Sequence, residues 1–144
     1  MNFNLSPADH AFASAFASGE LDPAEFHHRE HLRLAYVHLV RSGYPAAVRT
    51  VREDLLAFLD HHQVDPKKYH ETLTQAWVKA VAHFMDRTER ASGSIDFLNQ
   101  NPAILDSAIM RSHYSRETLQ SESARHNFVS PDREPIPAPV KTAH

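Results

Sequence analysis

Hydrophobic residues recur at helical spacing along the first two thirds of the chain, in stretches that proline and glycine separate. Several stretches begin with a residue that caps helices, followed by proline, as at Ser6-Pro7 and Asp65-Pro66. Proline suits the first turn because its missing N–H would have no partner there. The pattern predicts four main helices, over residues 7–18, 23–42, 44–63 and 65–85.

Beyond these stretches the hydrophobic pattern breaks into shorter pieces. It predicts helical segments over 95–100 and 101–114, and two short turns that begin at Ser115 and Ser121. The last residues, 131–144, are rich in proline and predict an extended or disordered tail. We therefore expect an all-α fold: one domain over 1–130, a bundle of four main helices with short C-terminal helices, followed by the tail.

Composition narrows the classes of protein that the chain can belong to. Its 144 residues fit one domain, and the absence of cysteine excludes disulfides and thiolate metal sites. The net charge of −3 argues against a nucleic-acid partner. No apolar run could span a bilayer, and the N-terminus does not read as a secretory signal. These features predict a cytoplasmic protein without a membrane or nucleic-acid partner.

Histidine is abundant, with 12 residues, and the densest group lies in the stretch "EFHHREHLRLA". At 100° per residue, His28 lies one turn before Leu32 in the apolar stripe of the predicted helix, and His31 lies on its flank. The side chain of His27 lies further round, toward solvent. The spacing therefore predicts that His28 and His31 turn inward together.

The fourth predicted helix carries a similar group near its start, in "KYHETLT". The helical wheel places Tyr69 and His70 toward the core and Glu71 away from it. If the two helix starts lie side by side, His28, His31 and His70 converge. Three histidines without sulfur suit a divalent transition metal, of which zinc and iron are the leading candidates, with positions left open for water or substrate.

Other polar residues are candidates for chemistry beside this metal. Tyr69 and Tyr114 are the candidate acid/base catalysts, and Ser115 and Arg125 the candidate substrate-binding residues. Each also has a simpler interpretation, because tyrosines pack in cores and serines cap helices. Arginines such as Arg125 commonly form surface ion pairs.

Three motifs together resemble a group of small bacterial all-helical proteins of unknown function, over roughly residues 12–131. The resemblance singles out the same histidines as the helical wheel, and it implies no activity. The motifs are F-x-H-x-x-H-L (Phe26, His28, His31, Leu32), Y-H-E-T-L-T (69–74) and Y-S-x-E-x-L-x-S-x-x-A-R (114–125).

The leading hypothesis is a metal-dependent enzyme that acts on a small molecule through its histidines. One alternative is a metal-free protein that binds a small ligand or performs acid/base chemistry. Another is a helical interaction module without catalysis. The sequence does not indicate a substrate, a reaction or an oligomeric state.

Overall fold

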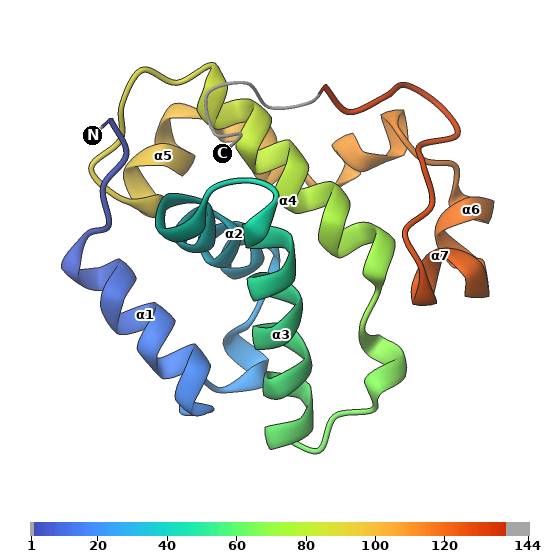
Figure 1. Cartoon of the computed structure of the whole chain (residues 1–144), viewed down its shortest axis with the longest axis horizontal. Coiled ribbons are helices and arrows are strands. Elements are labelled where there is room, and N and C mark those ends of the chain that lie inside the picture. Colours follow the sequence, from blue (N-terminus) through green and yellow to red (C-terminus); the bar gives the residue numbers. More distant parts are fainter. Residues whose placement is uncertain (1, 138–144) are drawn as a thin grey trace.

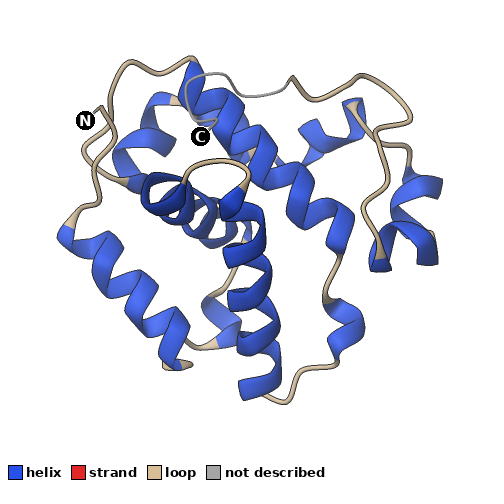
Figure 2. Cartoon of the chain, in the orientation of Figure 1, coloured by secondary structure: helices blue, strands red, loops and turns tan. Residues whose placement is uncertain are grey.

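The chain folds into helices and loops in the computed structural model, which describes residues 2–137 (Figures 1 and 2). No strand occurs in this range, so the all-α prediction is confirmed. No helix in it is long and apolar enough to cross a membrane. The elements are α1 (Pro7–Ser18), η1 (Pro23–Glu25), α2 (His28–Ser42), α3 (Ala46–His61), η2 (Pro66–Lys68), α4 (Glu71–Asp86), α5 (Ser94–Gln100), η3 (Pro102–Leu105), η4 (Ser107–Ser112), α6 (Arg116–Gln120) and α7 (Glu122–His126), where η marks a 3-10 helix.

Helix α2 lies at the centre of the molecule, between α1, α3 and α4 (Figure 1). Its middle is buried almost all round, from Leu32 to Leu39, apart from the partly exposed Arg33. A helix that buries more than one face has to be covered on several sides. The neighbouring helices supply this cover with Phe16 of α1, Phe58 of α3 and Val81 of α4.

The C-terminal third packs against the outer side of α4 and forms a second, smaller core. Its buried members are Ala76 and Ala80 of α4, Met110, Tyr114 and Ile136. Ile136 is 6% exposed, so the packed chain continues past residue 130, where the tail was predicted to begin. The rest of the predicted tail, residues 138–144, lies outside the described residues.

Two main helices begin later than the sequence predicts. The prolines at 23 and 66 start short 3-10 helices, and the following residues, Phe26 and Tyr69, leave helical geometry before α2 and α4 begin. A 3-10 helix seldom runs beyond one turn, because its hydrogen bonds are poorly aligned. His27 and His70 therefore occupy N-cap positions with extended backbone, where a helical wheel does not apply.

Candidate functional site

His28 lies at the start of α2, where its ring meets two other elements. The ring packs edge-on against Trp77 of α4, with centroids 4.5 Å apart. Its Nε2 lies 3.0 Å from the carbonyl oxygen of Ile104. A carbonyl only accepts, so Nε2 carries the proton. The other ring nitrogen, Nδ1, has no hydrogen-bond partner among residues 2–137.

His31 lies one turn further along α2, and its ring contacts Phe26, with centroids 4.1 Å apart. Burial of the ring against protein atoms lowers its pKa to about 4, and the charge of the neighbouring His28 acts in the same direction. The residue is nevertheless exposed to solvent, so the contact with Phe26 covers only part of the ring. No hydrogen bond to this ring occurs among residues 2–137. His31 is therefore an accessible imidazole without an internal partner.

His70 faces another part of the molecule. As N-cap of α4, it accepts a hydrogen bond at Nδ1 from the backbone N–H of Leu73, at 3.1 Å. Its Nε2 donates to the carbonyl oxygen of Leu119, at 2.7 Å. Both ring nitrogens are thus used inside the protein. The predicted convergence of His28, His31 and His70 is not found: no three histidine or carboxylate side chains in the described part of the chain are grouped to hold a metal ion.

The cap at His70 leads to a testable prediction. We expect His70→Ala to lower the free energy of unfolding by about 1–3 kcal/mol, because the cap and the bond to Leu119 are both lost. His70→Asn should recover about 1 kcal/mol, since asparagine also caps helices. Urea denaturation followed by circular dichroism measures both variants. An alanine variant as stable as the wild type would contradict the structural role of this ring.

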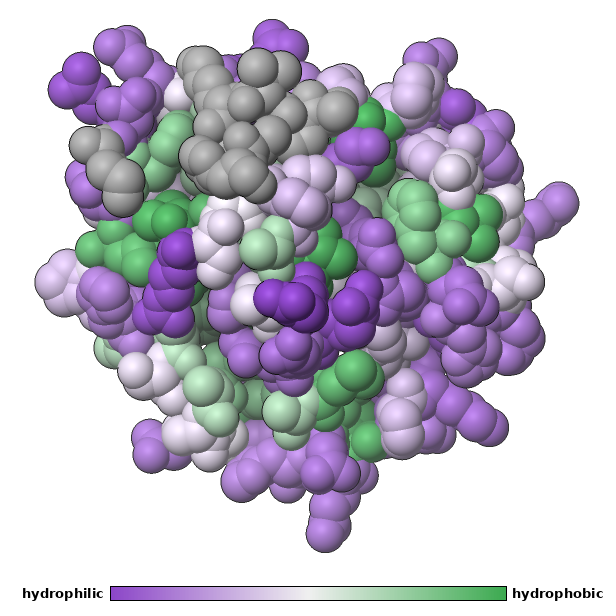
Figure 3. Space-filling model, viewed as in Figure 1, coloured by the Kyte–Doolittle hydropathy of each residue, from purple (hydrophilic) through white to green (hydrophobic). Residues whose placement is uncertain are grey.

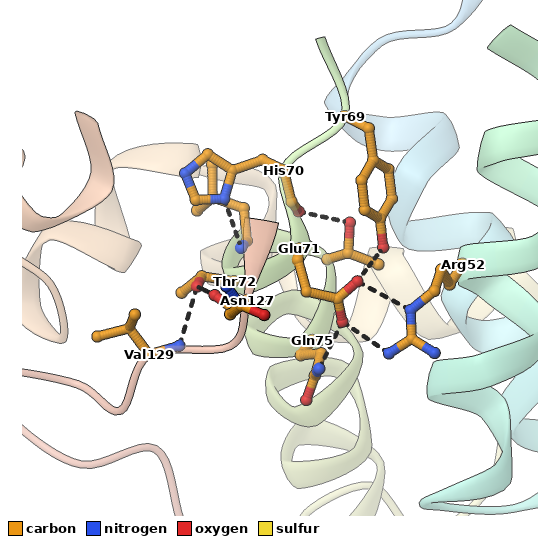
Figure 4. A network of polar contacts seen from close by, with 10 residues as sticks. Arg52, Tyr69, His70, Glu71, Thr72, Gln75, Asn127 and Val129 are labelled. Atoms are coloured by element: carbon orange, nitrogen blue, oxygen red, sulfur yellow. Dashed lines mark hydrogen bonds and ion pairs between the residues drawn. The ribbon is translucent and has the colours of Figure 1, made fainter. Parts of the chain in front are cut away.

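Glu71 is the centre of a polar network between α3 and α4 (Figure 4). The guanidinium of Arg52 binds it in bidentate fashion, with Nε at 2.8 Å from Oε1 and Nη2 at 2.6 Å from Oε2. The Tyr69 hydroxyl donates to Oε1 at 2.8 Å, and the Gln75 amide donates to Oε2. The prediction that Glu71 points away from the core is wrong: the residue is 8% exposed. The wheel failed because α4 buries more than one face: Val78, Ala82 and Met85, which lie on the same face as Glu71, are buried too.

Charge and burial in this network change two pKa values. The hydrogen bonds from Arg52 hold the pKa of Glu71 at about 2, against the opposing effect of burial. Burial and the neighbouring Glu71 raise the pKa of Tyr69 to about 12. Tyr69 therefore keeps its proton and donates it to a carboxylate inside the protein. This is the arrangement of an ion pair that joins two helices, and it leaves Tyr69 unsuited to acid/base catalysis.

The three remaining candidates hold the C-terminal segment in place. Tyr114 is fully buried, and its hydroxyl donates to the carbonyl oxygen of Val129 at 2.6 Å. Burial raises the pKa of Tyr114 to about 12. Ser115 caps α6, and Arg125 donates from Nη1 to the carbonyl oxygen of Lys67 at 2.6 Å. None of these residues is hydrogen-bonded to His28 or His31.

Two polar clusters escaped the sequence analysis. Asp9 is fully buried and binds Ser94 and Arg33. His38 is 8% exposed, and its Nε2 lies 2.7 Å from Asp54 Oδ2. The first cluster joins α1, α2 and α5, and the second joins α2 and α3. No local sequence pattern indicates either cluster, because the partners lie on different helices.

An open hollow of about 440 Å³ lies beside the C-terminal end of α3, and neither His28 nor His31 lines it. Figure 3 shows hydrophobic residues gathered in small separate patches, one of them over the lower end of α3. Leu56 is the large exposed residue there, at 41%. The hollow is lined by Leu56, Leu59, Asp60, Gln63, Val64, Asp65 and Pro66. Its walls offer no histidine, tyrosine or serine for chemistry.

Comparison with models of protein families, with curated proteins and with solved structures found no match for this chain. The resemblance to small bacterial helical proteins therefore stays a prediction. Any function has to be argued from the site itself.

Proposed function

We propose that the chain is a metal-free protein that binds a small molecule at the His28–His31 pair. The observation that carries the proposal is the state of the two rings. His28 is fixed by its bond to Ile104, and neither its Nδ1 nor the exposed ring of His31 has a hydrogen-bond partner among residues 2–137. Two neighbouring imidazoles with nitrogens open to a ligand would form the polar part of such a site.

Aromatic rings flank this pair on both sides. Trp77 lies against His28 and Phe26 against His31, and both aromatic residues are half-buried, with part of the side chain accessible. Binding sites for small molecules combine apolar surface with a few polar groups that fix orientation. The chemistry suits a planar ligand with an N–H or O–H donor, which His28 Nδ1 accepts while the ligand stacks on an aromatic face.

The metal-dependent enzyme that the sequence predicts has less support from the geometry. His28 and His31 would need a third ligand, and both nitrogens of His70 are bonded elsewhere. Catalysis by Tyr69 or Tyr114 has less support too, because each donates its proton to an internal acceptor and has a pKa of about 12. The cytoplasmic location and the small-molecule partner remain predictions from the sequence.

The proposal can be tested by NMR of the histidine side chains. Adenine and nicotinamide serve as planar probes with N–H donors, and their addition should shift the ring resonances of His28 and His31 in a saturable manner. We expect His31→Ala to weaken binding at least tenfold, because it removes an imidazole and the ring that covers Phe26. The matched control is His27→Ala, a neighbour with an exposed ring, which should bind as the wild type does.

Two results would contradict the proposal. One is an absence of change in the His28 and His31 resonances across a broad set of planar metabolites. The other is stoichiometric binding of zinc in calorimetry that both His28→Ala and His70→Ala abolish, because this result would restore the metal-dependent enzyme.

A further inference from the structure

The segment 129–137, here called the C-terminal strap, runs back from α7 along α4 and η4 (Figure 1). Its contacts are made mainly by its backbone. The N–H groups of Arg133 and Glu134 donate to the carbonyl oxygens of His113 and Ser112, at 3.0 and 3.1 Å. His113 Nδ1 in turn donates to the carbonyl oxygen of Glu134, at 2.7 Å.

Two further contacts hold the beginning of the strap. The Tyr114 hydroxyl donates to the carbonyl oxygen of Val129, and the N–H of Val129 donates to Thr72 Oγ1 at 3.0 Å. Thr72 belongs to α4 and is fully buried, so its hydroxyl is fixed in place. The protein thus presents a row of fixed hydrogen-bond donors and acceptors, from backbone and side chains, to an extended segment.

The strap has a single apolar anchor. Ile136 is 6% exposed and lies against the small residues Ala76 and Ala80 of α4 and against Met110. Every other strap side chain is exposed or only half-buried. The flanking prolines, 135 and 137, lack an N–H and favour an extended backbone, so they leave no donor unpaired.

One acidic residue of the strap adds a specific polar contact. The carboxylate of Asp132 accepts hydrogen bonds from the N–H of Ser115 at 2.9 Å and from the hydroxyl of Thr118 at 3.0 Å. Both donors belong to the first turn of α6, where an acidic group is favoured. The strap therefore contacts the rest of the protein through an aspartate that lies four positions before its buried isoleucine.

We propose that this surface is a peptide-binding groove, which the C-terminal strap of the same chain occupies in this structure, and that a partner protein binds the groove in its place. The partner segment would be extended and would follow the order of residues 132–137: aspartate, two variable residues, proline, an apolar residue and proline. Recognition of an extended peptide through its backbone, with a pocket for one side chain, is an established mode of binding. A segment that buries one apolar side chain can also detach without disrupting the main core. The groove is independent of the histidine site.

The test uses a fluorescent peptide with the sequence of residues 129–137 and the full-length chain. Wild type should bind it weakly, because the tethered strap competes at an effective concentration in the millimolar range. The full-length variant Ile136→Asp should bind at least tenfold more tightly, because its own strap no longer fills the groove. A second variant, Glu134→Pro, removes the N–H that pairs with Ser112 and should have the same effect.

Two controls distinguish specific binding of the peptide in the groove from nonspecific hydrophobic binding. A peptide with aspartate in place of its isoleucine should not bind, and Leu56→Asp, which alters an exposed apolar residue elsewhere, should behave as the wild type. The proposal fails if both strap variants keep the helical circular dichroism of the wild type but bind the peptide no better. It also fails if wild type forms a dimer that Ile136→Asp abolishes, because the groove would then receive the strap of a second copy.

Discussion

Replacement of Asp9 by alanine is expected to lower the free energy of unfolding by about 3–5 kcal/mol, because removal of one partner leaves a buried polar network uncompensated. The carboxylate is fully buried and joins three parts of the fold. It accepts from the N–H of Ser6 at 3.1 Å and from that of Ser94 at 2.8 Å. It also accepts from the Ser94 hydroxyl, and Arg33 Nη2 lies 3.4 Å away.

Without this carboxylate, the guanidinium of Arg33 loses its only anionic partner in the described part of the chain. The position of Arg33 above the ring of Phe12, 4.4 Å from the centroid, does not replace that charge. Denaturation with guanidinium chloride measures this loss in the free energy of unfolding. Asp22→Ala is the matched control, since Asp22 is an exposed cap that accepts from Ala24 N, and it should cost only about 1 kcal/mol. Equal losses in both variants would show that the buried network adds nothing.

The ion pair between Arg52 and Glu71 should make stability fall in acid. The pKa of Glu71 is about 2 in the folded protein and 4.5 in the reference state. A carboxyl group whose pKa is lowered by folding stabilises the fold fully at pH values above its pKa in the unfolded chain. This contribution disappears as the pH falls from about 4.5 through about 2. The shift corresponds to about 3 kcal/mol at most. Because Arg52 is 34% exposed, screening by solvent reduces the expected contribution to about 1–3 kcal/mol.

The difference in unfolding free energy between wild type and Glu71→Gln isolates this effect, because the other carboxyl groups titrate in both proteins. We expect the difference to be largest at pH 7 and to approach zero near pH 2. Glu53→Gln is the matched control, since Glu53 is 66% exposed and lies 3.7 Å from Arg49. It should show almost no difference at any pH. A Glu71 difference that is independent of pH would exclude an ionic contribution.

The helical elements could be predicted from the sequence because their causes are local. The stop at Gly19 and the caps at Ser115 and Ser121 all lie where the pattern placed them. The starts of α2 and α4 could not be predicted. A proline after aspartate begins a 3-10 helix as readily as an α-helix, and only the packing of Phe26 and Tyr69 on the core fixes where each turn ends.

The later start of α4 altered the candidate site, because it makes His70 a cap with both ring nitrogens bonded inside the protein. Helical periodicity specifies which residues share a face of one helix, but it did not place His31, which is exposed and not turned inward with His28.

By itself the sequence determined the all-α class and most helix ends, because each depends on interactions within about one turn. The tertiary structure alone decided which helix faces meet, that Asp9 binds Ser94, and that Ile136 packs against Ala76 and Ala80 of α4. Such contacts join residues far apart in the chain. They depend on the packing of whole helices, which no local pattern specifies.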